Sequence, residues 1–180
     1  FTALYSGFVN GDTASVLSGA PSLTTTATTA SPVGTYTITA SPGTLSATNY
    51  SFNFVNGTLT IGAAALTVTA NNATRAYGAA NPGFSVAYSG FVNGDNQSVL
   101  SGSPTFSTTA TVLSGVGTYP ITPATGTLSA ANYSFSFVNG TLTISKATLV
   151  VTANNATRGY GSSNPGFTAS YSGFMNGDTV

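Results

Sequence analysis

The chain carries almost no charge and lacks four residue types. Its 180 residues include three Lys or Arg and three Asp, with no Cys, His, Glu or Trp. Without cysteine, no disulfide supports the fold. General acid–base catalysis uses groups such as His, Glu or Asp, and a serine nucleophile needs a neighbouring base. A calcium site needs several carboxylates. We therefore expect no catalytic residue, no metal site and no cofactor, and we expect that the protein is not an enzyme.

The same scarcity of charge restricts the partners. Three cations cannot neutralise many phosphates, so nucleic acid is not expected to bind. No apolar run approaches the length of a membrane-spanning helix, so we expect no membrane-spanning segment. A net charge of zero also removes the repulsion that keeps copies of a protein apart. The main expected partner is therefore the protein itself.

What the chain does have is an internal repeat of 83 residues without insertion or deletion. The motif Tyr-Ser-Gly-Phe-Val-Asn-Gly-Asp at 5–12 returns at 88–95 and, with Met in place of Val, at 171–178. Roughly two-thirds of the comparable positions are identical, so the repeat is the unit of the fold. We divide the chain into the C-terminal part of one repeat, a complete repeat and the N-terminal part of the next, at 1–61, 62–144 and 145–180. We expect these to belong to a longer array.

Alternation of apolar and polar residues predicts a mainly β fold of about six short antiparallel strands per repeat. In the complete repeat these are 66–70, 84–88, 105–111, 118–122, 133–138 and 141–144. One short helix is expected at 95–101, with Asp95 as its N-terminal cap and the preceding Asn93–Gly94 leading into it. The order of elements fits either a β-grasp-like sheet covered by a helix or an Ig-like sandwich. Because only about four residues separate Ile144 from Leu149, we expect the repeats to lie end to end in a stiff rod.

The dipeptide Asn139–Gly140, copied at Asn56–Gly57, predicts a tight hairpin. Asn-Gly permits the positive φ angles of a type I′ turn. A two-residue loop here pairs Phe137 with Leu142, so that large apolar side chains meet on one face.

Arg75 and Asp95 are the charged residues shared between copies, and they recur as Arg158 and Asp178. One hypothesis is an ion pair between Arg75 and Asp95 that fixes the first loop against the start of the helix. The alternative is that Asp95 is only a helix cap and Arg75 is solvated.

Several ordered motifs resemble the MBG domain of the YGX type, with Tyr77–Gly78 and Tyr160–Gly161 as its signature. The matching segments are 66–78, 88–95, 117–119 and 132–144. This resemblance implies a tandem array in a secreted bacterial surface protein, often an adhesin, and therefore an extracellular location. It implies no catalytic or metal-binding residues and does not indicate a ligand.

Two functions remain open at this point. The first is a structural fibre or adhesin stalk that gives length and associates with other copies. The second is a multivalent adhesin module that binds surface glycans or proteins, with Tyr77, Tyr88 and Tyr119 as stacking platforms unless they pack in the core. A surface-layer component is a third possibility.

Overall fold

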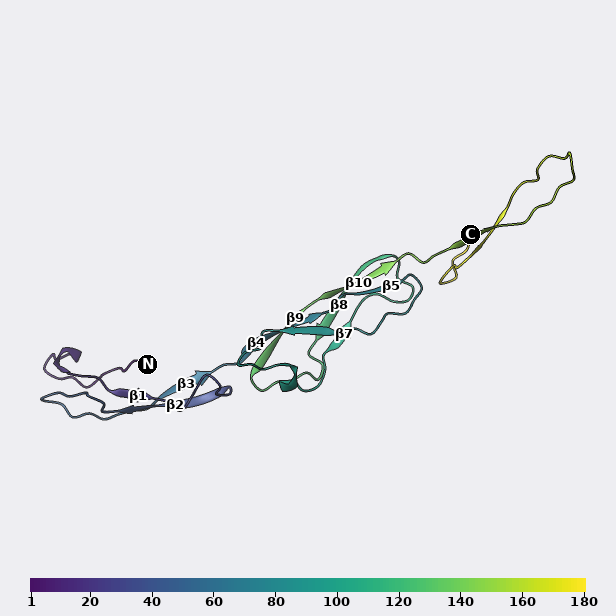
Figure 1. Ribbon diagram of the computed structural model, residues 1–180. Coiled ribbons are helices and arrows are strands. Elements are labelled where there is room, and N and C mark those ends of the chain that lie inside the picture. The colour runs from purple at the N-terminus through teal and green to yellow at the C-terminus, as the bar shows by residue number, and fades with distance from the viewer. The chain divides into compact units, whose positions relative to one another are not determined.

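The computed structural model describes all 180 residues and consists mainly of strands and loops. The helical segments are two 3-10 turns of three residues, η1 (Ala14–Val16) and η2 (Gln97–Val99). The strands, drawn as arrows in Figure 1, are β1 (Ser22–Thr24), β2 (Gly34–Ser41), β3 (Gly57–Ile61), β4 (Ala64–Ala70), β5 (Ala73–Ala76), β6 (Val86–Ser89), β7 (Thr105–Ser107), β8 (Gly117–Ala124), β9 (Tyr133–Val138), β10 (Gly140–Ser145), β11 (Val150–Ala153) and β12 (Ala169–Ser172). The prediction of a mainly β protein is confirmed.

The complete repeat contains two sheets. One has the strand order β5-β10-β8-β7, in which β10 runs antiparallel to β8 and parallel to β5. The other has the order β6-β4-β9, with β4 antiparallel to β6. We expected six antiparallel strands, but the complete repeat has seven, and two of them, β5 and β10, are parallel. The additional strand is β5, at residues that we expected to form a loop. Since no helix covers either sheet, the two-sheet arrangement fits a sandwich better than a β-grasp fold.

Two segments of the complete repeat pass from one sheet to the other, and their crossing points lie next to each other. β4 continues through Asn71–Asn72 into β5, and β9 continues through Asn139 into β10. The Asn72 side chain spans this crossing, because its Oδ1 accepts a hydrogen bond from the backbone N–H of Thr141 at 2.8 Å. Each segment therefore contributes one strand to each sheet, as strands do at the corners of packed sheets.

The predicted hairpin at Asn139–Gly140 is wrong. Neither residue has a positive φ angle, and β10 pairs with β8 instead of β9, so Leu142 lies opposite Tyr119 and not Phe137. Glycine is needed here for another reason. A Cβ on Gly140 would lie 2.5 Å from the carbonyl oxygen of Ala70, where the two crossing segments approach each other.

Gly140→Ala is expected to destabilise the complete repeat by about 1–3 kcal/mol, because the added methyl group overlaps backbone atoms. Gly57→Ala is the matched control, since a Cβ at this equivalent position meets only the Ile38 side chain, at 3.7 Å. Urea denaturation followed by tyrosine fluorescence measures both. Equal losses for the two variants would contradict the crossing and favour a local turn requirement.

The type I′ turn lies instead at Asn93–Gly94. Asn93 has φ 56° and Gly94 φ 80°, and the backbone N–H of Asp95 donates to the Val92 carbonyl at 3.0 Å. These are the features of a type I′ turn. Asn-Gly in the repeated motif at 5–12 and 171–178 has the same positive φ angles.

The helix expected at 95–101 is reduced to the single turn η2. Its cap is Asn96, whose Oδ1 accepts from the backbone N–H of Ser98 at 2.9 Å, and not Asp95. The helix cannot continue because Ser101 is held in an antiparallel bridge with Ser129.

The core of the complete repeat follows the predicted alternation. Its largest fully buried side chains are Leu66, Val68, Ile121, Leu142 and Ile144. They come from β4, β8 and β10, and the residues between them in each strand are more exposed. The prediction that Leu66 and Val68 share one face of a strand is confirmed.

The first repeat keeps part of this framework. Tyr36 of β2 lies opposite Leu59 of β3, as Tyr119 lies opposite Leu142 in the complete repeat. Ile38 of β2 is partly exposed, whereas its copy Ile121 in β8 is fully buried.

The chain divides into two compact units that do not coincide with the repeats. Each unit contains residues of two consecutive repeats. The first comprises Phe1–Ala64, Phe91–Val99 and Ala130–Ser134, and the second Ala65–Gly90, Leu100–Ser129 and Phe135–Val180. The repeat is therefore the unit of sequence but not the unit of packing.

Candidate functional site: the contacts between consecutive repeats

The type I′ turn of one repeat binds the preceding repeat. Within the first compact unit, the Asn93 side-chain Nδ2 donates to the carbonyl oxygen of Thr29 at 3.1 Å. Within the second unit, Asn176 Nδ2 donates to the carbonyl oxygen of Val112 at 3.2 Å. Both pairs occupy the same positions of the 83-residue repeat. The same hydrogen bond therefore joins both pairs of consecutive repeats.

A second asparagine adds to the contact in the first unit. The Asn132 Oδ1 accepts from the backbone N–H of Val33 at 3.1 Å, while its backbone carbonyl accepts from Ala64 at 2.9 Å. Asn132 thus connects the end of the first repeat, the start of the second and the beginning of β9. Side-chain amides can do this because each offers both a donor and an acceptor.

The signature Tyr77–Gly78 lies at the contact with the third repeat. A Cβ on Gly78 would lie 2.6 Å from the Cβ of Met175, and its φ of 81° also favours glycine. Tyr77, Phe174 and Met175 line a hollow of about 480 Å³ beside it. The copy at Tyr160–Gly161 is fully exposed, and nothing lies within 4 Å of a Cβ placed on Gly161. The glycine of the signature leaves room for a side chain of the following repeat.

A tyrosine holds the type I′ turn in place. The hydroxyl of Tyr133 donates to Asp95 Oδ2 at 2.7 Å and accepts from the backbone N–H of Val92 at 3.1 Å. Burial raises the pKa of Tyr133, and the Asp95 carboxylate raises it further. The hydroxyl therefore keeps its proton at neutral pH and remains a donor. Tyr50 and Asp12 make the same 2.7 Å contact in the first repeat.

Tyr133→Phe is expected to cost about 1–2 kcal/mol, because the turn loses one charge-assisted hydrogen bond and one backbone partner. Tyr119→Phe is the control, since its exposed hydroxyl donates to a single carbonyl, that of Gly115 at 3.0 Å. Its loss is expected to stay within about 0.5 kcal/mol. Thermal unfolding of both variants measures the difference, and a smaller effect for Tyr133 than for Tyr119 would contradict this role.

Arg75 and Asp95 do not form the expected ion pair, and Arg75 is not solvated. Arg75 is 7% exposed. Its Nε donates to Asn81 Oδ1 at 2.8 Å and its Nη2 to the Thr111 carbonyl at 2.5 Å, while Asp95 binds Tyr133. Both interpretations of this pair were therefore wrong. The guanidinium instead connects β5 to the loop before β8.

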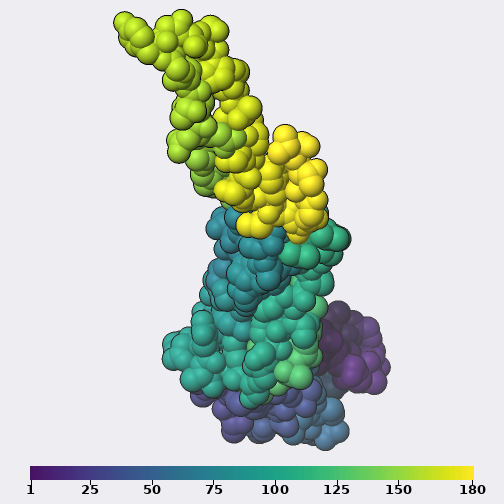
Figure 2. Space-filling view, turned by 90° about the vertical axis from the view of Figure 1, so that its right-hand side faces the viewer, coloured from purple at the N-terminus to yellow at the C-terminus, as the bar shows by residue number.

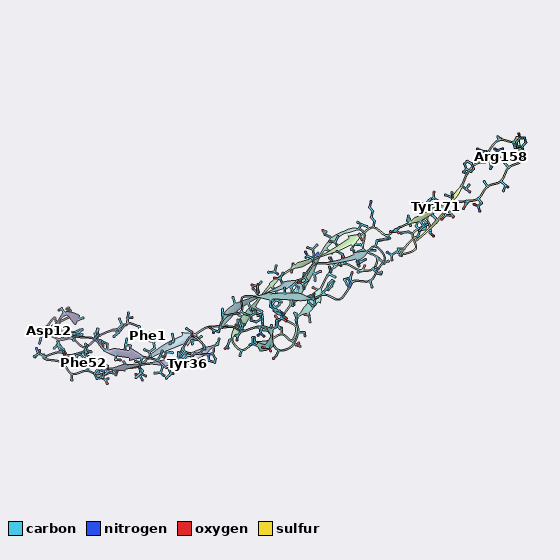
Figure 3. All side chains as sticks on the ribbon, viewed as in Figure 1. Phe1, Asp12, Tyr36, Phe52, Arg158 and Tyr171 are labelled. Carbon is cyan, nitrogen blue, oxygen red and sulfur yellow. The ribbon has the colours of Figure 1, made fainter.

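The copies of these charged residues are exposed. Arg158 bonds only to nearby carbonyls, at Gly159 and Ser162, and Figure 3 shows it toward the end of the C-terminal hairpin. Asp178 is exposed beside the type I′ turn at its own position. The surroundings of Arg158 and Asp178 therefore differ from those of Arg75, which is buried, and of Asp95, which binds Tyr133.

Two of the three tyrosines considered as sugar platforms contribute to the core of the complete repeat. Tyr77 and Tyr119 pack against the core cluster that contains Ile121, Leu142 and Ile144. This packing covers part of each ring, so core packing explains these aromatic positions in the described structure.

Comparison with family models assigns the chain to a protein family. The model of the MBG domain (YGX type) matches residues 1–60, 66–143 and 149–180. The chain belongs to this family. MBG repeat domains are typical of surface or secreted bacterial proteins. No curated protein and no solved structure matches the chain. None of its helical segments has the length and apolar character needed to cross a membrane.

The asparagines that join the MBG repeats were not predicted from the sequence. Asn93 was interpreted as leading into the start of a helix, and Asn132 was considered only as part of the MBG-like motif at 132–144. A signal was present: Asn93 recurs as Asn10 and Asn176 inside the motif that changes least between copies.

Proposed function

We propose that this chain is a structural repeat region of an extracellular bacterial fibre or adhesin stalk, which gives length and self-association without catalysis. The observation that carries the proposal is the repeated junction bond, from Asn93 to Thr29 and from Asn176 to Val112. A contact that recurs with the sequence period extends to any number of repeats. This is how repeat arrays gain stability from neighbouring units.

The connections between repeats support the same function. Residues 146–149 alone separate β10 from β11, and residues 62–63 separate β3 from β4. Linkers this short leave consecutive repeats little freedom. The strands also lack the lysines and glutamates that usually prevent edge-to-edge association, which favours contact between copies.

Electron microscopy of the protein on its native, unextracted cell surface tests this function. The expected result is a fibre with an axial period equal to one repeat and with density continuous between repeats. Flexible strings without axial order would contradict a stiff stalk.

The second candidate is a protein- or glycan-binding adhesin module. It is favoured by one exposed apolar loop of the complete repeat, where Val112, Leu113 and Val116 are 44%, 67% and 54% exposed. The first repeat differs here, with Thr29, Ala30 and Val33 at the same positions. Binding of the isolated chain to a glycan array or to host-cell proteins would support this candidate, and its loss in Leu113→Ser would assign it to the loop.

A further inference from the structure

The type I′ turn that joins the repeats contains the dipeptide most prone to deamidation. Asparagine followed by glycine readily closes into a five-membered succinimide ring, because glycine has no Cβ to hinder attack by its backbone nitrogen. The complete repeat has this dipeptide twice, at Asn93–Gly94 and at Asn139–Gly140. The two sites have the same sequence and different surroundings.

The backbone nitrogen of Gly94 is sterically open. Figure 2 shows that much of the complete repeat, in teal and green, lies at the visible surface, and both Asn93 and Gly94 are exposed. Nothing lies within 4 Å of a Cβ placed on Gly94. The hydrogen bond of the turn is made by the next residue, Asp95, whose N–H donates to the Val92 carbonyl at 3.0 Å. The turn therefore does not use the Gly94 N–H.

The second dipeptide, Asn139–Gly140, is protected. Gly140 is buried in β10, where it lies opposite Ile121 of β8. A Cβ on Gly140 would lie 2.5 Å from the carbonyl oxygen of Ala70, so the backbone around it is closely packed. Ring closure at Asn139 requires this part of β10 to leave the sheet, which costs more free energy than the opening of an exposed turn.

We propose that Asn93 is a site of spontaneous deamidation and that the reaction releases the junction between repeats. The Gly94 backbone nitrogen gives up its proton to solvent and attacks Cγ of Asn93. A Cγ–N bond forms, the Cγ–Nδ2 bond breaks, and the departing group takes up a proton and leaves as ammonia. One water molecule then opens the ring at either carbonyl carbon and yields aspartate or isoaspartate. Water is the only co-reactant.

The product has the wrong group for the junction bond. Asn93 Nδ2 donates to the Thr29 carbonyl oxygen at 3.1 Å. The carboxylate of aspartate only accepts hydrogen bonds, and in this place it faces the Thr29 oxygen, which is also an acceptor. Isoaspartate adds a further carbon atom to the backbone of the turn and so displaces the side chain. Both products remove the bond.

The reactive dipeptide recurs once in each repeat at the residue that makes the junction. Asn176–Gly177 is the copy of Asn93–Gly94, and Asn176 Nδ2 donates to the Val112 carbonyl at 3.2 Å. An array therefore loosens at its junctions while the repeats between them stay folded. This inference goes beyond the proposed function, because it concerns how long a junction lasts.

Tyr133 slows the reaction by holding the turn closed. Ring closure needs a rotation about the Asn93 Cα–C bond that brings the Gly94 nitrogen to Cγ, and this rotation breaks the bond between Asp95 and Val92. The Tyr133 hydroxyl opposes the rotation, since it accepts from the Val92 N–H at 3.1 Å and donates to Asp95 Oδ2 at 2.7 Å. Tyr133 is thus a positioning residue for the turn.

Peptide mapping by mass spectrometry, after incubation of the chain at mildly alkaline pH, measures deamidation at Asn93 and Asn139 in one sample. We expect Asn93 to react about tenfold faster or more, because an exposed turn opens more often than a buried strand. Tyr133→Phe is expected to raise the rate at Asn93 about fivefold, because the turn loses hydrogen bonds that keep it closed. Tyr119→Phe is the matched control, with a change within about twofold. Equal rates at the two asparagines, or an Asn93 that stays intact, would overturn the proposal.

Asn93→Asp supplies the aspartate product directly, and hydrogen exchange of the Val33 amide reports on the junction. The Val33 N–H donates to Asn132 Oδ1 at 3.1 Å in the same contact between repeats. We expect Asn93→Asp to speed this exchange about fivefold or more. Asn96→Asp adds the same charge nearby and keeps the oxygen that caps Ser98, so exchange at Val33 should not change. Equal exchange in the two variants would overturn the release of the junction. Either failure leaves the fibre to be tested by microscopy, so the two proposals fail separately.

Discussion

Leu66→Ala is expected to lower the free energy of unfolding of the complete repeat by about 3–5 kcal/mol. Leu66 is 0% exposed, and its strand β4 pairs with neighbours on both edges, so little relaxation can fill the cavity that the smaller side chain leaves. A loss of this size is a large fraction of the stability of a small domain. Urea denaturation followed by circular dichroism in the strand region measures it.

Leu149→Ala is the control for this prediction. Leu149 is the copy of Leu66, but it is 47% exposed, so we expect its truncation to cost less than about 1 kcal/mol. The comparison holds the residue type, the exchange and the surrounding sequence nearly constant. Similar losses at the two positions would show that the complete repeat does not have the buried β4 described here.

Arg75→Met is expected to destabilise the complete repeat by about 3–5 kcal/mol. Methionine keeps much of the apolar stem but removes every donor of the guanidinium. The Thr111 carbonyl and the Asn81 Oδ1 then lose the charged partner that binds them in a partly buried setting. Arg75→Lys is expected to recover only part of the loss, because one ammonium cannot reproduce the planar arrangement of donors.

Arg158→Met separates this effect from a general effect of removing positive charge. Arg158 is exposed, and its contacts are to the nearby carbonyls of Gly159 and Ser162, so we expect a change within about 0.5 kcal/mol. Differential scanning calorimetry of the two variants gives the comparison. An Arg75→Met protein as stable as the unaltered chain would contradict a structural role for the buried guanidinium.

Local alternation was sufficient to locate most of the strands but not to pair them. Residues 133–138 form β9 as predicted, and the predicted 118–122 and 141–144 lie within β8 and β10. The error lay at Asn139, where an Asn-Gly pair suggested a turn. A segment that crosses from one sheet to another has apolar and polar residues alternating before and after the crossing, as a hairpin has before and after its turn. The requirement for Gly140 is visible only in its close approach to Ala70, which is distant in the sequence.

The predictions of the helix and of the ion pair were wrong for a related reason. Aspartate is a common helix-capping residue, but the Asp95 carboxylate accepts a hydrogen bond from Tyr133, 38 residues later. The cap of the short helical turn is therefore Asn96. Arg75 and Asp95 were paired because they are the shared charges of the repeat. In the structure, the Arg75 guanidinium donates its hydrogen bonds to the Asn81 side-chain amide and the Thr111 carbonyl. The composition of the chain does not reveal these uncharged partners.

The repeat itself was the most informative feature of the sequence, and it also allowed the junctions to be recognised in the structure. A bond such as Asn93 to Thr29 would carry little weight alone. Its recurrence from Asn176 to Val112, at the same place in the next repeat, makes it a property of the MBG array.

The most direct test of the proposed stalk is the distance distribution between two spin labels on consecutive repeats. The chain has no cysteine, so Thr37→Cys and Thr118→Cys, both at exposed strand positions, give two unique labelling sites. Double electron–electron resonance is expected to give one narrow distribution for this protein. The distribution should broaden when Asn93→Ala and Asn132→Ala remove the junction bonds. A broad distribution with intact asparagines would contradict a stiff array of joined repeats.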